Sequence, residues 1–217
     1  MKSLHTAPQL HKGWHSRGYL PHFDQPGLIQ AITFRLADSL PVHVVAALAE
    51  ELDEETSAAR RARVEAHLNA GYGGCSLRDP RIGKLVENAF IYFDGVRYRL
   101  IAWVVMPNHV HVLVEIFEGY PLDTIIHSWK SYTANEANKM LNRKGRFWYP
   151  DYYDRFIRDE RHFNNAVRYI HENPVQAGLV ENPEDWPFSS ARDWQTRQAG
   201  QDARDPSPSG SHGSQSS

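Results

Sequence analysis

The pattern of hydrophobic and polar positions predicts a chain that alternates between strands and helices. Residues 28–36 and 98–106 are short apolar runs with β-branched residues, which is typical of strands. The tight turn Pro107-Asn108 comes after the second run, and residues 109–116 read as a further strand, so 98–116 predicts a β-hairpin. Longer segments with helical spacing cover residues 41–70, 79–93, 122–141 and 159–173.

The residues at the ends of these segments fit the assignment. Glycines at 71, 73 and 74 end the first helix, and Asp79-Pro80 opens the second. Asp159 is the predicted N-cap of the last helix, and Pro174 is predicted to end it, because a proline disfavours helical geometry at the residue before it. A hairpin among helices predicts an α+β fold with an antiparallel sheet and helices packed on it.

Composition sets the domain limits and excludes several classes. We expect an irregular N-terminal arm over residues 1–27, one compact domain over 28–194, and a disordered tail over 195–217, which lacks Leu, Ile, Val and aromatic residues. A net charge of −2 argues against a wholly basic nucleic-acid coat protein, and a single cysteine, Cys75, excludes an internal disulfide. We find neither an apolar run long enough for a membrane span nor a secretory signal, so we expect a cytoplasmic protein.

The strand that begins at His109 offers a candidate metal site. Successive side chains of a strand point to opposite faces, so Val110, Val112 and Val114 share one face. His109 and His111 share the other, with Cα atoms roughly 6.5–7 Å apart, which is close enough to hold one ion. Among twelve histidines such a pair also arises by chance, so a site needs a third ligand.

The helix predicted over 159–173 can supply further chemistry. Tyr169 and Asn173 lie one turn apart, at the edge of the apolar stripe formed by Phe163, Val167 and Ile170. Tyr169 offers a nucleophilic phenol and Asn173 offers a carbonyl oxygen for a metal. The alternative is that Tyr169 packs at the rim of the core and Asn173 only ends the helix.

A basic segment with interleaved aromatic residues indicates nucleic-acid binding. Between Ser128 and Arg168 the chain has nine basic and five acidic residues. Basic side chains contact phosphates, and exposed aromatic rings stack on unpaired bases. A solvated face over an aromatic core would give the same composition. The candidate DNA-binding residues are Trp129, Lys130, Arg155, Arg158, Arg161 and Arg168.

Several motifs in order resemble one protein family. The run Trp103–Leu113, which contains the histidine pair, resembles the His-hydrophobic-His motif of single-tyrosine transposases that act on single-stranded DNA. Further matching motifs are Trp129–Ser131, Phe147-Trp148, Tyr153–Asp159, Tyr169–Val180 and Trp186–Ser190. Together, from about Ile29 to Trp194, they resemble the bacterial REP-associated tyrosine transposases, a branch of the HUH superfamily.

The resemblance implies a role for each candidate residue. His109 and His111 would be metal ligands with Asn173 as the third, and Tyr169 would be the nucleophile. It also implies a ferredoxin-like (RRM-like) antiparallel sheet with a later tyrosine-bearing helix, and a divalent Mg²⁺ or Mn²⁺ ion. The implied activity is cleavage and strand transfer near single-stranded or hairpin REP-type palindromic DNA through a 5′-phosphotyrosine, by a monomer or homodimer.

Two other functions remain open at this point. A catalytically silent regulator that binds hairpin DNA or RNA would use the same basic and aromatic segment. A metal hydrolase would use the histidine pair with water, but Leu113 stands where the short hydrolase motif has an aspartate.

Overall fold

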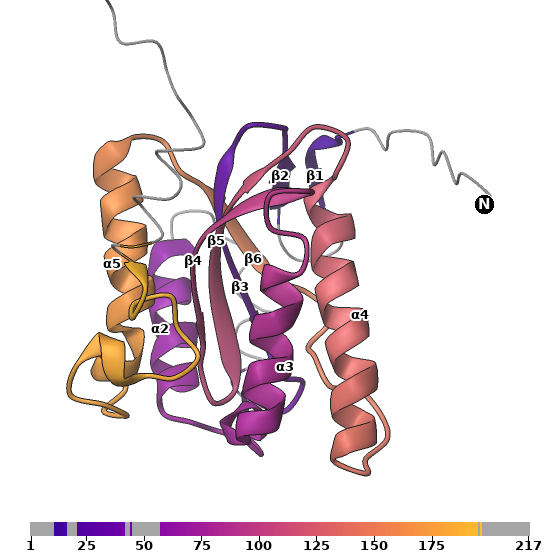
Figure 1. The fold of residues 1–217 in the computed structure, drawn as a ribbon, viewed down its shortest axis with the longest axis vertical. Helices are drawn as coiled ribbons and strands as arrows, with labels where there is room; N and C mark the ends of the chain where they lie inside the picture. Colours follow the sequence, from indigo (N-terminus) through magenta and orange to yellow (C-terminus); the bar gives the residue numbers. More distant parts are fainter. Residues whose placement is uncertain (1–10, 17–20, 42–43, 45–56, 195, 197–217) are drawn as a thin grey trace, which may run out of the picture.

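The computed structural model describes residues 11–16, 21–41, 44, 57–194 and 196 (Figure 1). Its strands are β1 (Gly13–Ser16), β2 (Pro21–Asp24), β3 (Ile29–Arg35), β4 (Tyr98–Val105), β5 (His109–Ile116) and β6 (Tyr153–Phe156). Its α-helices are α2 (Ser57–Asn69), α3 (Pro80–Ile91), α4 (Leu122–Met140) and α5 (Glu160–Gln176), and short 3₁₀ turns cover Ser76–Arg78 and Pro183–Asp185.

The main sheet has four antiparallel strands in the order β4-β5-β3-β6. Helices α2 and α3 both lie between β3 and β4, a tight turn connects β4 to β5, and α4 connects β5 to β6. With α2 as an addition, this order of elements is the β-α-β-β-α-β order of a ferredoxin-like fold. The predicted α+β fold is therefore confirmed, and α5 comes after it as the predicted tyrosine-bearing helix.

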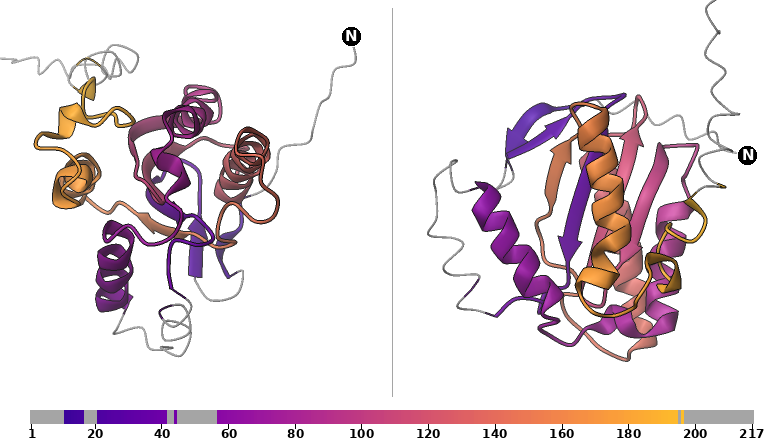
Figure 2. Two further views of the ribbon diagram at one scale, coloured as in Figure 1. Left: turned by 90° about the horizontal axis from the view of Figure 1, so that it is seen from below. Right: turned by 90° about the vertical axis from the view of Figure 1, so that its left-hand side faces the viewer.

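The two faces of the sheet are covered by different helices (Figure 2). Val110, Val112 and Val114 join the larger core beneath α3 and α4. Leu113 faces the opposite way and packs with Val167 and Ile170 of α5. The alternation predicted for β5 is therefore correct. Because helices cover both faces, the histidines of this strand are buried as well as the valines.

Most predicted elements are confirmed, and the bounds of β3, β4, β5, α3, α4 and α5 differ from the prediction by a few residues at most. The strand β6 was not predicted. Helix α5 continues through Pro174 to Gln176, so the prediction that Pro174 ends it is wrong. The proline lies in the last turn, where its missing N–H removes one helical hydrogen bond. Asn173 and Pro174 are both buried, and their packing keeps this turn helical.

The N-terminal arm contains a two-stranded ribbon, so the prediction that it is irregular throughout is wrong. Strands β1 and β2 pair antiparallel, with Trp14 opposite Phe23. His22 anchors this ribbon, because its fully buried ring bonds to Asp154 of β6 and lies 3.3 Å from an Asp151 oxygen.

Of the helix predicted over 41–70, only residues 57–69 form a described helix, and nearly all of the preceding part lies outside the described residues. The predicted tail does too, apart from residue 196.

The segment after α5 closes the outer edge of the sheet at β4. The Val105 amide donates to the Phe188 carbonyl at 2.8 Å, and the Ser190 amide donates to the Trp103 carbonyl at 3.0 Å. The Phe188 ring lies so close to α3 that a Cβ atom at Gly83 would be 2.7 Å from it. Residues Trp186–Ser190 therefore stabilise the fold, because they form hydrogen bonds with the outer edge of β4.

None of the helices in the described ranges is long and apolar enough to cross a membrane.

We predict that His22 makes the stability of the protein depend on pH. Burial alone would lower the pKa of His22, but Asp151 and Asp154 outweigh burial and raise it to about 9. The protonated ring therefore stabilises the folded state by up to about 3 kcal/mol at pH 6, and this contribution is lost as the pH rises through 9. Urea unfolding of the wild type and of His22→Gln should show a difference in unfolding free energy that shrinks from pH 6 to pH 10. A difference that stays constant would contradict this assignment.

Candidate metal and nucleophile site

The two histidines of β5 point at one place between the sheet and helices α2 and α5. His109 is fully buried and His111 is 2% exposed. Their rings meet edge to face, and the Nε2 atoms lie 3.1 Å apart. Two nitrogen atoms that each lie about 2.1 Å from one ion have a similar separation. The side chains are therefore already arranged as a pair of ligands.

An uncharged side chain contacts the Nδ1 atom of each imidazole, on the side of the ring away from Nε2. His109 Nδ1 lies 2.8 Å from Asn108 Oδ1, and His111 Nδ1 lies 2.8 Å from the Thr33 hydroxyl. A carbonyl oxygen only accepts, so His109 donates from Nδ1 and its Nε2 carries the lone pair. Burial lowers the pKa of both rings below the usual value, which keeps them neutral. Neutral imidazoles with free Nε2 atoms are the form that binds a metal.

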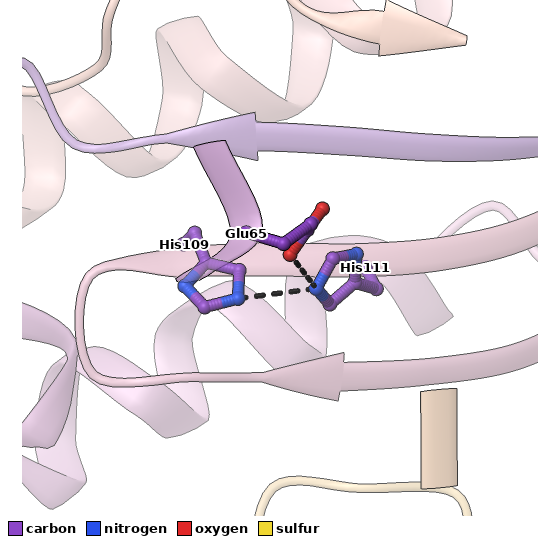
Figure 3. Close-up of side chains that lie close together, drawn as sticks. All are labelled: Glu65, His109 and His111. Atoms are coloured by element: carbon purple, nitrogen blue, oxygen red, sulfur yellow. Dashed lines mark hydrogen bonds and ion pairs between the residues drawn. The ribbon is translucent and has the colours of Figure 1, made fainter. Parts of the chain in front are cut away.

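Glu65 of α2 is a third potential ligand, which the sequence did not reveal (Figure 3). Its carboxylate lies 3.5 Å from His111 Nε2, and one ligand atom each from Glu65, His109 and His111 all lie within 4.8 Å of one another. The side chain is 26% exposed, and its Oε2 atom makes no hydrogen bond within the described residues.

A weak signal for Glu65 was present in the sequence. Val64 and Leu68, which are four residues apart, form the buried stripe of α2. Glu65 is the acidic residue beside that stripe, so its carboxylate meets the protein rather than water. No local motif marks it, because its partners lie more than forty residues further along the chain.

The predicted nucleophile lies against the histidine pair. The Tyr169 ring meets the His111 ring edge to face, with centroids 5.2 Å apart. Its hydroxyl is buried, its polar neighbours are Glu65 and Asn173, and it makes no hydrogen bond of good geometry among the described residues. Burial raises the pKa of Tyr169 well above the usual value, the negative charge of Glu65 adds to this, and Asn173 acts in the opposite direction. The phenol is thus protonated in this arrangement.

Asn173 lies one turn further along α5 and is completely buried. Neither its Oδ1 nor its Nδ2 atom has a hydrogen-bond partner among the described residues. An unsatisfied buried amide costs free energy, and a bound ion or ligand is one way in which such a group is satisfied. A site of two imidazoles, a carboxylate, an amide oxygen and a phenol could hold a divalent ion and attack a phosphate.

The predicted DNA-binding residues lie in different environments. Trp129 is 2% exposed and packs on Phe90 and Tyr98 in the core, so it cannot stack on a base, and this prediction is wrong. The Lys130 ammonium donates to the carbonyl oxygens of Tyr149 and Pro150, so it has a structural role. The four arginines are exposed, on β6, on α5 and between them: Arg155, Arg158, Arg161 and Arg168.

Comparisons with known proteins agree with this arrangement. Residues 84–173 match a family model described as "Transposase IS200 like". This segment is therefore similar to the IS200-like transposases. The match includes His109, His111, Tyr169 and Asn173, and it begins after Glu65.

Two bacterial relatives support the same family. A REP-associated tyrosine transposase of Escherichia coli (strain K12) is 31% identical over 93 residues, which are 43% of this chain and 54% of that protein. A Haemophilus influenzae protein given the same family name is 28% identical over 104 residues, or 43% of this chain and 58% of its own length. The chain thus spans just over half the length of these relatives, and the resemblance to REP-associated tyrosine transposases is confirmed.

A solved structure supports the fold. It is described as a REP-associated tyrosine transposase bound to a REP hairpin, and it superposes with a TM-score of 0.53 at 20% sequence identity. The superposition covers 82% of this chain and 84% of the other.

We predict that Thr33 positions His111 for metal binding. Thr33→Val keeps the shape of the side chain but removes the hydroxyl that holds Nδ1, so the affinity for Mn²⁺ should fall by about 10-fold or more. Isothermal titration calorimetry with MnCl₂ measures this, and Thr33→Ser should retain the affinity. Equal affinity of Thr33→Val and the wild type would show that the hydroxyl plays no part.

Proposed function

We propose that this protein cleaves and rejoins single-stranded DNA, with Tyr169 as the nucleophile and a divalent ion at the histidine pair. The main support is the convergence of the Tyr169 ring on His111, whose Nε2 atom faces that of His109 at 3.1 Å. The buried phenol makes no well-formed hydrogen bond among the described residues and lies beside two neutral imidazoles, which is expected of a group that acts on a ligand.

The residues present fit a divalent metal ion. His109 and His111 would bind it through Nε2, and Glu65 would add a carboxylate oxygen. The orphaned amide of Asn173 would add a carbonyl oxygen, as the family resemblance implies. When bound, the ion would polarise a phosphate oxygen and offset developing negative charge. Mixed nitrogen and oxygen ligands are compatible with Mg²⁺ and with Mn²⁺.

Tyr169 would carry out the bond exchange. Its phenolic oxygen attacks the phosphorus, an O–P bond to Tyr169 forms, and the bond from phosphorus to the 3′ oxygen breaks. The phenol loses its proton and the leaving 3′ oxygen gains one. The product is a 5′-phosphotyrosine with a free 3′ hydroxyl, and a second 3′ hydroxyl reverses the step. Strand transfer therefore needs no ATP.

Exposed arginines provide a path for the DNA backbone. Burial lowers the pKa of His162, and the nearby charges of Arg155 and Arg158 lower it further, while Asp159 acts in the opposite direction. Arg161 and Arg168 lie seven residues apart on α5 and share an exposed face, and Arg168 precedes the nucleophile. A folded hairpin would place its phosphates along this positive surface. Hairpin DNA is the proposed partner because a structural relative was solved with one.

We predict a covalent adduct between Tyr169 and DNA. Single-stranded hairpin oligonucleotides labelled on the 3′ side of the cleavage point should give a slower band on a denaturing gel in Mn²⁺ and none in EDTA. Tyr169→Phe should abolish the band, because phenylalanine has no oxygen to form the ester. Tyr132→Phe is the matched control, since Tyr132 is 54% exposed on α4, which covers the other face of the sheet.

The same gels separate the other functions. Strand cleavage without a protein-linked band would indicate a hydrolase that uses water. Hairpin binding without cleavage, equal in the wild type and Tyr169→Phe, would indicate the silent regulator. Either result would overturn the proposal.

A further inference from the structure

Asn108, in the turn between β4 and β5, is completely buried and uses its whole amide group. Its Nδ2 atom donates to the carbonyl oxygens of Leu68 and Tyr72 at 3.1 Å each. Its Oδ1 atom accepts from His109 Nδ1 at 2.8 Å. A tight turn does not need these contacts, since glycine, aspartate and serine also form such turns. The amide group therefore does more than form the turn.

The two carbonyl groups belong to the end of helix α2. Leu68 lies in its last turn, and Tyr72 follows three residues after the helix ends at Asn69. The last carbonyl groups of a helix have no partner within it, so they bond to other groups of the protein or to water. Asn108 thus holds α2 by its C-terminal end.

Helix α2 contributes little to the hydrophobic core in the part of the chain that the structure describes. Of its described side chains, Val64 and Leu68 are buried, and they form a small cluster apart from the two larger cores, with Leu40, Val44 and Tyr153. An element with little buried apolar surface detaches locally at a lower cost in free energy than the core does. The hydrogen bonds at the end of α2 therefore matter more for its position than they would in a core helix.

The position of Glu65 depends on this attachment. Glu65 lies three residues before Leu68, about one turn away on the same helix. Its carboxylate lies 3.5 Å from His111 Nε2 and forms, with the two imidazoles, the group of potential metal ligands in Figure 3. A shift of α2 would carry Glu65 away from both imidazoles.

We propose that Asn108 is a positioning residue that couples helix α2, and with it Glu65, to the imidazole of His109. The inference rests on the metal site of the proposed function and gives Asn108 no contact with the ion. Because one amide group holds two of the three ligands in place, docking of α2 and binding of the metal favour each other. Linkage is reciprocal, so an ion that binds Glu65 also holds α2 in its docked position.

The variant Asn108→Asp separates this coupling from a purely structural role. The carboxylate keeps an oxygen that accepts from His109, as carboxylates beside metal-bound histidines do. It cannot donate to Leu68 or Tyr72, and its negative charge repels their carbonyl oxygens. A purely structural role predicts that the variant weakens all ligands alike. Loss of the coupling removes the contribution of Glu65 alone.

A double-mutant cycle with Glu65→Gln measures the coupling. In calorimetric titrations with MnCl₂, Glu65→Gln should weaken binding by the wild type about tenfold or more, because it removes a ligand. In the Asn108→Asp background it should change the affinity less than twofold, because Glu65 no longer lies beside the ion.

Asn138→Asp is the matched control for this cycle. Asn138 lies on α4, which covers the other face of the sheet, and its Nδ2 atom donates to the Gly145 carbonyl at 3.0 Å. Glu65→Gln should keep its full effect in this background. Asn108→Ser is the second variant at the turn, because serine suits a turn and lacks the amide group. It should remove the effect of Glu65→Gln as Asn108→Asp does.

Hydrogen–deuterium exchange tests the reciprocal effect without any change at Asn108. Saturating Mn²⁺ should slow amide exchange in α2 of the wild type at least fivefold more than in α3, which packs on the opposite face of the sheet and reports any general stabilisation. In Glu65→Gln the two helices should differ less than twofold. Exchange in α2 that Mn²⁺ slows no more than in α3 would overturn the inference. An equal effect of Glu65→Gln with and without Asn108 would overturn it as well.

The gels with Tyr169→Phe separate this inference from the proposed function. Formation of the Tyr169 adduct, together with an unchanged effect of Glu65→Gln in Asn108→Asp, would refute the coupling and leave the cleavage reaction standing. Coupling without any adduct would support the role of Asn108 at a metal site and refute cleavage.

Discussion

The Nε2 atoms of His109 and His111 face each other at 3.1 Å in the interface between the sheet and helices α2 and α5. Two imidazoles keep this arrangement only if the backbone of β5 and both rings are held in place. β5 lies inside the sheet, between β4 and β3, so the backbone that carries both histidines is fixed by ladders on two sides. Asn108 and Thr33 fix the rings. Helix α5 brings Tyr169, and α2 brings Glu65.

A second buried histidine, His22, is charged, in contrast to the neutral His109 and His111. His22 is fully buried like His109, but two aspartates face it and raise its pKa to about 9, so the ring is charged, bonds to Asp154 and forms an ion pair with Asp151. Burial lowers the pKa values of His109 and His111, and their Nε2 atoms lie close to each other and to Glu65. A satisfied charged pair holds an N-terminal ribbon in place. A neutral pair beside an unpartnered amide and phenol is the arrangement expected of a binding site.

Local sequence patterns predicted how the candidate residues of β5 and α5 lie on their elements, and the family resemblance selected them as site residues. Alternation along 109–116 placed the valines and the histidines on opposite faces, and helical spacing placed Tyr169 one turn from Asn173. Glu65 could not be predicted in this way, because the contact between α2 and β5 is set by tertiary packing. Composition grouped Trp129 with the DNA-binding residues, since it cannot distinguish an exposed ring from one buried against Phe90. The end of α5 was mispredicted at Pro174 because local sequence does not show burial either. Burial of the last turn outweighs the preference of the residue before a proline for a non-helical conformation.

The most direct test of the metal site is a crystal structure of the protein with Mn²⁺, analysed by its anomalous difference density. The account predicts one strong peak about 2.2 Å from the Nε2 atoms of His109 and His111, with a Glu65 oxygen in the same coordination sphere. A peak elsewhere, or no peak at saturating Mn²⁺ with the two imidazoles still in contact, would contradict it.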